Sequence, residues 1–445
     1  MPDAPAINLH HPALSLWQSI VHRSLSEGDA GLHTTADHPA MIAASSAGAA
    51  IAAGEPEPAS LGGTFAAGAA LYARLAVAKF EGDAGAAAKI EDELRYSVVD
   101  PLWAELLLQY ERSLLEERVD SYPRHRGLDD FILAPMPDDV TIALVADWGT
   151  GTPAARVVLE QIATLQPDVV IHLGDVYFSG LPGEVRAHFL DLFDAVFPDP
   201  ARRPRVYSLA GNHDRYSGGR GYLELLGRLG QPASYFCLQN QAWQLLAGDT
   251  GLHDRDPRHR RANVTSLEED ELGWHLDKIA RFGASRGTIL LTHHQLFSSA
   301  GIGHDGEGRP LALNPSLHGA LGGVLGQLAF WFWGHEHNLS VFAPYAGLAR
   351  GRGLGSGAIP IFVAQRPYRP AEGLIVPQGE DGPPTTLPGT QLGDNGVVHH
   401  HAFAVLHLEG PRATARYYQS DTTGIEPGHA PPPGPPLFTE TVTRS

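Results

Sequence analysis

The chain has 445 residues, 43% of them hydrophobic and 18% charged, which fits a globular protein with one large domain or two ordinary ones. Its formal net charge of -18 disfavours a nucleic-acid-binding protein that works by neutralising phosphates, because such a protein needs clustered Lys and Arg. The charge does not exclude an enzyme that handles phosphate through bound cations, since metal ions reverse the local electric field.

The sequence shows no sign of export or membrane insertion. The N-terminus lacks a basic stretch followed by an apolar run, and no apolar run reaches the roughly 18 residues of a membrane span. The single cysteine, Cys237, excludes an intrachain disulfide, and we expect it in a buried strand. We therefore expect a cytoplasmic protein with no membrane partner. The sequence gives no indication of oligomeric state.

Residues 1–120 are predicted to form a helical N-terminal domain or cap. Ala-rich stretches at 40–53 and 59–80 are separated by a Pro-containing turn, and another helix is expected over 102–117. No group in this region has the spacing of a metal or nucleophile site. The polar segment 121–138 is predicted to be a linker.

From residue 139 the pattern changes to short β-rich runs that alternate with helical segments. The expected strands span residues 141–146, 168–173, 205–209, 234–238, 243–247, 288–291, 328–333, 339–342, 358–363, 402–408 and 413–418. The expected helices span residues 153–165, 184–197 and 266–281. This alternation predicts an α/β domain over residues 139–425. The Pro-rich residues 426–445 are predicted to be an extended tail.

Five short polar blocks each follow a predicted strand. They are Ala146-Asp147-Trp148-Gly149, Gly174-Asp175, Gly211-Asn212-His213-Asp214, Thr292-His293-His294 and Gly334-His335-Glu336-His337-Asn338. The loops at the carboxyl ends of strands converge on the ligand crevice of an open α/β sheet, so we expect these side chains to meet. Carboxylate, amide and imidazole donors suit Mn, Fe or Zn rather than a thiolate site.

Such donors can support phosphate ester hydrolysis. Two metal ions roughly 3.5–4 Å apart can hold a bridging hydroxide as the nucleophile and clamp both oxygens of an in-line phosphoryl displacement. The residues therefore predict a metal-dependent phosphoesterase.

The order D-x-G, G-D-x-x, G-N-H-D, H, G-H-x-H resembles the calcineurin-like metallophosphoesterase superfamily over roughly residues 139–345. Its D-x-G block is similar to that of the purple acid phosphatase-like branch. The resemblance implies a central β-sandwich of mixed sheets flanked by helices, and two divalent or trivalent metal ions, with Fe, Mn or Zn expected.

The resemblance also implies a ligand set. Asp147 and His337 would bind the first metal, and Asp175 would bridge both metals. The ligands that it implies for the second metal are Asn212, His293 and His335. His294 competes with His293 for this role.

Further roles are expected around these ligands. His213 would act as general acid to the leaving oxygen, and Asp214 would orient its surroundings. The remaining candidates for substrate contact are Asn212, Arg215 and His294; a planar Arg guanidinium suits a phosphate.

The sequence departs from the superfamily at two positions. The His that most members place two residues after the first Asp is replaced by Gly149. Purple acid phosphatases compensate with a Tyr ligand three residues after the bridging Asp, but that position is Phe178, and the Tyr is at 177. We expect Tyr177 to pack in the core, although it could reach the metal if the loop turned differently. We therefore expect a weak first-metal site and no strong visible absorption band.

Three functions are compatible with these sequence features. The first is a phosphatase or phosphodiesterase acting on a small phosphorylated substrate such as a nucleotide or cyclic nucleotide. The second is a catalytically weak member of the fold that serves as a binding module. The third is a nuclease, which the acidic charge disfavours.

Overall fold

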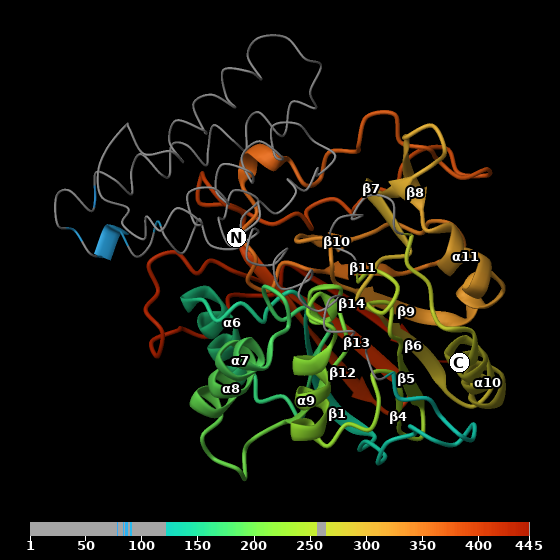
Figure 1. Cartoon of the computed structure of the whole chain (residues 1–445), viewed down its shortest axis with the longest axis horizontal. Coiled ribbons are helices and arrows are strands. Elements are labelled where there is room, and N and C mark those ends of the chain that lie inside the picture. Colours follow the sequence, from blue (N-terminus) through green and yellow to red (C-terminus); the bar gives the residue numbers. More distant parts are fainter. Residues whose placement is uncertain are drawn as a thin grey trace, which may run out of the picture.

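Two six-stranded sheets face each other across a shared hydrophobic core in the computed structural model (Figure 1). The structure describes residues 122–255 and 264–444, together with a few residues between 78 and 90. The predicted N-terminal helical domain lies almost entirely outside the described residues. The expected architecture of mixed sheets flanked by helices is confirmed for the rest of the chain.

The first sheet has the strand order β14-β13-β12-β1-β2-β3. Its strands are β1 (Asp139–Val145), β2 (Val169–His172), β3 (Arg205–Ser208), β12 (His401–Glu409), β13 (Arg412–Ser420) and β14 (Phe438–Thr443). β1, β2 and β3 run parallel, whereas β12, β13 and β14 pair antiparallel. The helices that follow its parallel strands are α6 (Pro153–Thr164), α7 (Pro182–Glu184), α8 (Asp191–Val196) and α9 (Arg220–Leu229), with a π-helical turn at Val185–Leu190.

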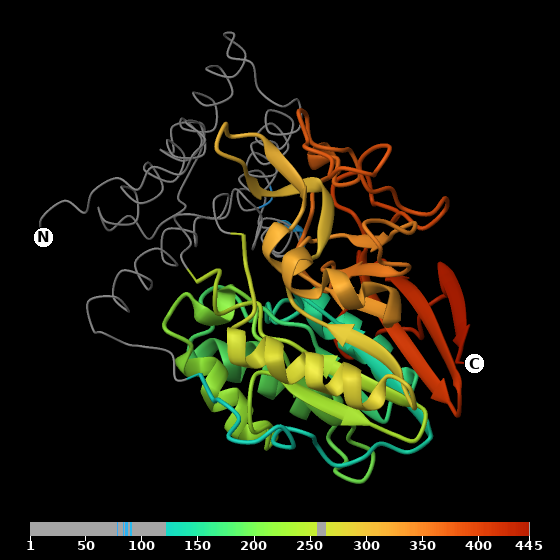
Figure 2. The same cartoon turned by 90° about the vertical axis from the view of Figure 1, so that its right-hand side faces the viewer.

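The second sheet has the order β10-β11-β9-β6-β5-β4. Its strands are β4 (Phe236–Gln239), β5 (Trp243–Ala247), β6 (Gly287–Leu291), β9 (Leu328–Trp333), β10 (Leu339–Val341) and β11 (Gly351–Leu354). Two helices, α10 (Glu269–Phe282) and α11 (Pro315–Leu321), accompany it. A separate hairpin of β7 (Phe297–His304) and β8 (Pro310–Leu313) stands apart from both large sheets (Figure 2).

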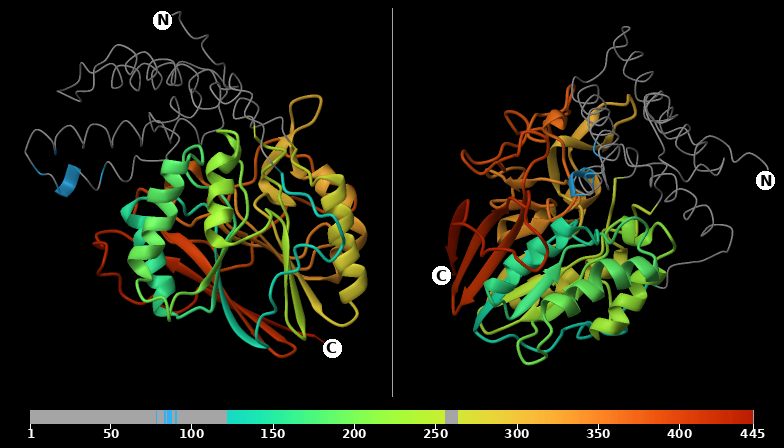
Figure 3. Two further views of the ribbon diagram at one scale, coloured as in Figure 1. Left: turned by 60° about the horizontal axis from the view of Figure 1, so that its bottom comes forward. Right: turned by 90° about the vertical axis from the view of Figure 1, so that its left-hand side faces the viewer.

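Figure 3 shows the layers in order: helices, first sheet, second sheet, helices. Alternation along β1 explains this arrangement. Ile142 and Leu144 enter the core between the sheets, while Ala143 and Val145 pack towards the helices of the first sheet. The almost continuous apolar run of β1 therefore reflects burial on both faces.

Three boundaries differ from the sequence predictions. The predicted tail contains a strand, β14, because Phe438, Glu440 and Val442 alternate inward along its length and pair with β13. The predicted linker is also ordered against the second sheet, where Ile132 bridges to Cys237. Residues 358–363 form a loop and the start of a short turn rather than a strand. In the described part of the chain, no helix has the length and apolarity needed to cross a membrane.

Candidate metal centre

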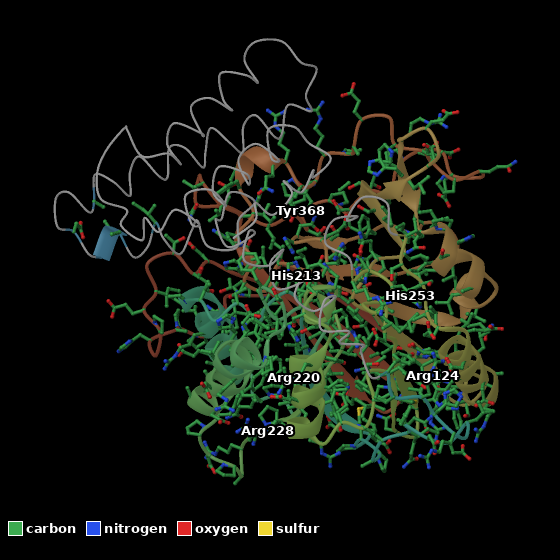
Figure 4. All side chains as sticks on the ribbon, in the orientation of Figure 1. Arg124, His213, Arg220, Arg228, His253 and Tyr368 are labelled. Atoms are coloured by element: carbon green, nitrogen blue, oxygen red, sulfur yellow. The ribbon has the colours of Figure 1, made fainter. Side chains whose placement is uncertain are left out.

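All five polar blocks lie at the carboxyl ends of parallel strands, and both sheets contribute. Asp147 follows β1, Asp175 follows β2 and Asn212 follows β3 in the first sheet. His293 follows β6 in the second sheet, and the block that contains His335 and His337 follows β9. Figure 4 shows His213 near the centre of the view, above α9.

Unusual backbone conformations bring the candidate ligands together. Asp147, Asp175 and His335 have φ angles of 53°, 75° and 65°, in the left-handed region that side chains with a Cβ rarely adopt. The adjacent backbone is tightly packed, since a Cβ on Gly211 would lie 2.0 Å from Asp175 Oδ1. Strained conformations of this kind cluster at functional sites, where the surrounding structure holds them in place.

The first cluster of donors consists of Asp147, Asp175 and His293, whose ligand atoms all lie within 4.8 Å of one another. His293 Nε2 is 3.4 Å from Asp175 Oδ2. His337 Nε2 is 3.4 Å from Asp147 Oδ1, so this imidazole adjoins the same cluster. The structure thus brings together the residues predicted for the first and bridging positions.

The second cluster consists of His293, His294 and His335, again within 4.8 Å. Asn212 Oδ1 lies 3.1 Å from His293 Nε2 and 3.0 Å from His335 Nδ1. His293 donates its Nδ1 hydrogen to the carbonyl oxygen of Leu173 at 2.9 Å, which turns Nε2 towards the clusters. The residues predicted for the second metal therefore also converge.

Tyr177 occupies a place that differs from the packing role predicted for it. Its hydroxyl oxygen lies 2.8 Å from Asp147 Oδ1, 3.1 Å from Asp175 Oδ2 and 3.1 Å from His337 Nε2. The phenol therefore stands among all three donors predicted for the first metal. It is a fourth candidate ligand for that position, reached from two residues after the bridging Asp rather than three.

His213 lies directly beside the clusters. Its backbone N–H donates to Asp175 Oδ1 at 2.9 Å, and its Nδ1 hydrogen is donated to the carbonyl oxygen of Phe178 at 2.6 Å. The ring is packed against Tyr177, with ring centroids 4.3 Å apart. These contacts fix both the position and the tautomer of the imidazole.

Asp214, predicted to support catalysis, braces the backbone. Its carboxylate accepts hydrogen bonds from the N–H groups of Gly211 at 2.8 Å, Asp175 at 2.9 Å and Val176 at 3.1 Å. The side chain thereby ties the loop after β3 to the loop after β2. This geometry supports an orienting role rather than direct contact with substrate.

The two remaining substrate-contact candidates both have partners inside the protein. His294 Nε2 lies 3.1 Å from Asp254 Oδ2, and its Nδ1 lies 3.0 Å from Thr250 Oγ1. Arg215 is buried in an ion pair with Asp249, with both side chains 0% exposed. The structure gives Arg215 a carboxylate partner in place of the predicted substrate contact. The sequence pattern did not predict the contacts of Asp254 and Thr250 with His294, because these contacts depend on the tertiary fold.

The electrostatics of the clusters favour bound cations. Burial would raise the pKa of Asp175, but the neighbouring His293 and His213 hold it well below its usual value. Burial would likewise lower the pKa of His293, yet the Asp175 carboxylate outweighs this effect and raises it to about 10. Burial and the charge of Asp175 raise the pKa of Asp214 to about 7. A field that holds a proton on a buried imidazole would also attract a metal ion, whose binding would release that proton.

The donor chemistry fits two metal ions. Carboxylate, amide, imidazole and phenol donors match Fe, Mn or Zn. The two clusters share His293, and Asp175 Oδ2 lies 3.4 Å from His293 Nε2 and 3.1 Å from the Tyr177 hydroxyl, so this carboxylate adjoins the shared histidine.

Residues 140–339 match the family model described as calcineurin-like phosphoesterase, and this part of the chain belongs to that family. The fold is similar to that of PPD1, a purple acid phosphatase from yellow lupin (Lupinus luteus) seeds, with 14% identity and a TM-score of 0.44. That match covers 70% of this chain and 55% of the lupin protein, so it spans about half of the latter. Vps29 of Chaetomium thermophilum is a further structural match, with 9% identity, a TM-score of 0.29 and coverage of 69% and 96% of the two chains. The comparison with curated proteins found no match.

Proposed function

We propose that this protein is a metal-dependent phosphoesterase that hydrolyses a mono- or diester bond of a small phosphorylated substrate. The observation that carries the proposal is the convergence of six predicted ligands from two sheets into the adjoining clusters described above. His213 lies next to Asp175 of the first cluster, where a proton donor for the leaving group is needed.

The chain offers a ligand set for each ion. Asp147, Tyr177 and His337 would hold the first ion, and Asp175 would be shared. The candidates for the second ion are Asn212, His293 and His335. Two bound ions would polarise a water molecule and neutralise the charge of the phosphoryl group.

His213 is suited to proton transfer by its tautomer. Because its Nδ1 hydrogen is donated to Phe178, Nε2 is the nitrogen that exchanges a proton with the substrate. In the proposed reaction a water oxygen bonds to phosphorus and the P–O ester bond breaks. His213 enters the reaction as the imidazolium, with a proton on each ring nitrogen, and its Nε2 proton goes to the departing oxygen. This leaves the neutral Nδ1–H tautomer, and the proton released by the water restores the imidazolium.

The test is metal removal and replacement. The protein is stripped with chelator, and Mn, Fe, Zn, Ni or Co is restored in turn before assay with a chromogenic monoester and diester. We expect turnover only with metal. Asn212→Ala should reduce both metal content and rate, whereas His213→Ala should keep its metal and lose about 100-fold to 10,000-fold in rate. His318→Ala, in α11, is the matched control and should behave as the wild type.

Failure of every metal to support turnover on either ester would contradict the proposal. That outcome would favour the alternative of a binding module without catalysis.

A further inference from the structure

We propose that Asp249 is a positioning residue that fixes the placement of His213 relative to His294. It does so through an ion pair with Arg215 on one side and through the loop of residues 249–254 on the other. The inference rests on the proposed function, since it concerns how His213, the proposed proton donor, is held in position beside His294.

One series of contacts links Asp249 to His213. His213 and Arg215 belong to one short helical turn, in which the Arg215 N–H donates to the Asn212 carbonyl at 3.0 Å. Arg215 Nη2 donates to Asp249 Oδ2 at 2.5 Å. The guanidinium also lies over the ring of Tyr222 in α9, 5.2 Å from its centroid. The turn that carries His213 is therefore anchored through Arg215.

A second series of contacts links Asp249 to His294. Asp249 Oδ1 accepts hydrogen bonds from the N–H groups of Gly251 at 3.1 Å and Leu252 at 3.2 Å, which sets the course of the loop. Thr250 Oγ1 in this loop accepts the His294 N–H at 3.0 Å and lies 3.0 Å from its Nδ1.

The far end of the same loop engages the other imidazole nitrogen. Asp254 Oδ2 lies 3.1 Å from His294 Nε2, so this nitrogen donates while Nδ1 accepts from the Thr250 hydroxyl. His294 is thus held at both nitrogens by the loop that Asp249 organises.

The loop is also pressed against the metal centre and supported from behind. A Cβ on Gly251 would lie 2.5 Å from the carbonyl oxygen of Gly211, so the two loops are in direct backbone contact. Behind the loop, the buried Glu271 accepts the Asp249 N–H at 2.8 Å. Asp249 therefore connects Glu271, behind the loop, with the segments that carry His213 and His294.

The carboxylate is chemically required for this junction. It accepts from the guanidinium with one oxygen and from two backbone N–H groups with the other, whereas an amide has only one acceptor oxygen. Desolvation offsets much of the attraction in a buried ion pair, but a hydrogen-bonded pair of this kind fixes direction and distance. We infer that the Asp249–Arg215 pair holds the turn that carries His213 in a fixed position.

The test uses the double variant Arg215→Gln/Asp249→Asn, which removes both charges and so leaves no unpaired buried charge. Rates are compared on phenyl phosphate, whose leaving group needs protonation, and on 4-nitrophenyl phosphate, whose leaving group does not. Misplacing the proton donor should cost about 100-fold on the phenyl ester and about 10-fold or less on the nitrophenyl ester. Metal content should stay at the wild-type level.

The matched control is Arg352→Gln/Glu440→Gln, which removes another ion pair; its other contacts are to Arg350, Phe342, Gly351 and Tyr417. It should leave the ratio of the two rates unchanged. Equal losses of the test variant on both esters, or a change in ratio shared with the control, would overturn the inference.

Further outcomes of the experiment are distinguishable. If the test variant does not fold, Arg215→Lys is measured in its place; it keeps the charge but not the planar donor geometry, and the same change in ratio is expected. If the wild type acts only on diesters, the same comparison is made with a phenyl and a 4-nitrophenyl diester. If it hydrolyses neither monoesters nor diesters with any metal, the proposed function itself fails, which is distinguishable from equal losses in an active protein.

Discussion

The hydroxyl of Tyr177 lies 2.8 Å from Asp147 Oδ1, so the first metal position has a phenol donor that the sequence pattern assigned to packing. The sequence comparison placed this ligand three residues after the bridging Asp, and that position is Phe178. The path of the loop decides which side chain points inward, and that path is set by contacts such as those of Asp214 with the backbone after β2. The six candidate ligands were predictable because each lies in a short polar block that follows a strand.

Tyr177→Phe should weaken the first metal position. Removing one donor from the set of Asp147, Asp175, His337 and Tyr177 is expected to lower metal affinity by about 10-fold to 100-fold. A preparation loaded with ferric iron should show a visible absorption band in the wild type that the variant lacks. Metal affinity and the absorption spectrum are the measurements.

Tyr222→Phe is the control for Tyr177→Phe, because it removes a buried hydroxyl that donates to the Ser208 carbonyl without touching a candidate ligand. Unchanged affinity in Tyr177→Phe would show that the phenol only packs beside the site.

His401 should make the protein less stable in mild acid. His401 opens β12 and is buried. Burial lowers its pKa to about 4, so the folded state resists a proton that the unfolded chain binds below about 6.5. Its contribution is therefore present above pH 6.5 and is lost as the pH falls towards 4, by about 2 kcal/mol between pH 7 and pH 5.

The measurement is the free energy of unfolding by denaturant at both pH values. His401→Gln should reduce its decline between pH 7 and pH 5 by that amount, and an unchanged decline would rule out this histidine as the cause.

At the scale of the elements, each candidate ligand lies on a loop that follows a buried strand. The positions of β1, β2, β3, β6 and β9 in the sequence were therefore sufficient to predict where the candidate ligands would meet. The contacts that the supporting loop of residues 249–254 makes with His294 were not predictable in the same way. Its Thr250 and Asp254 act on a histidine 40 or more residues away in sequence, and short spacing patterns do not reveal such contacts.

Gly211→Ala should disrupt the junction between the loops after β2 and β3. The added Cβ would lie 2.0 Å from Asp175 Oδ1 and 2.8 Å from its backbone nitrogen, so the bridging carboxylate must move. We expect the variant to lose bound metal, as measured by elemental analysis of the purified protein. Gly227→Ala in α9 is the matched control, since a Cβ there meets nothing within 4 Å. The control should keep its metal and gain roughly 0.5–1 kcal/mol in stability.

At the scale of the whole molecule, a buried ion pair joins the two sheets. Arg352 on β11 donates two hydrogen bonds to Glu440 on β14, at 2.6 and 2.8 Å. The sequence could not show this contact, because β14 lies in a segment whose Pro-rich beginning resembles a tail. The sandwich as a class was predictable from the alternation of strands and helices and from the resemblance, whereas the edge strands were not.

Arg352→Met should lower the free energy of unfolding by about 3 kcal/mol, because it leaves Glu440 without its main partner in a buried setting. Adding Glu440→Gln should recover part of this loss, since the uncompensated charge is then removed. Denaturant unfolding of the three proteins measures both steps, and a double variant no more stable than Arg352→Met would contradict the explanation.

The division of the ligands between the sheets has a consequence for folding. Asp147, Asp175 and Asn212 extend from one sheet, and His293, His335 and His337 from the other, so an ion bound to both sets would act as a cross-link within the sandwich. The unfolded chain, in which these ligands are spread over nearly 200 residues, would bind the ion far less tightly. Mass action then makes the apparent stability rise with free metal concentration, by about 2.7 kcal/mol at 100 times the dissociation constant. Metal supply would thus set the apparent stability of the sandwich as well as the rate of the proposed reaction.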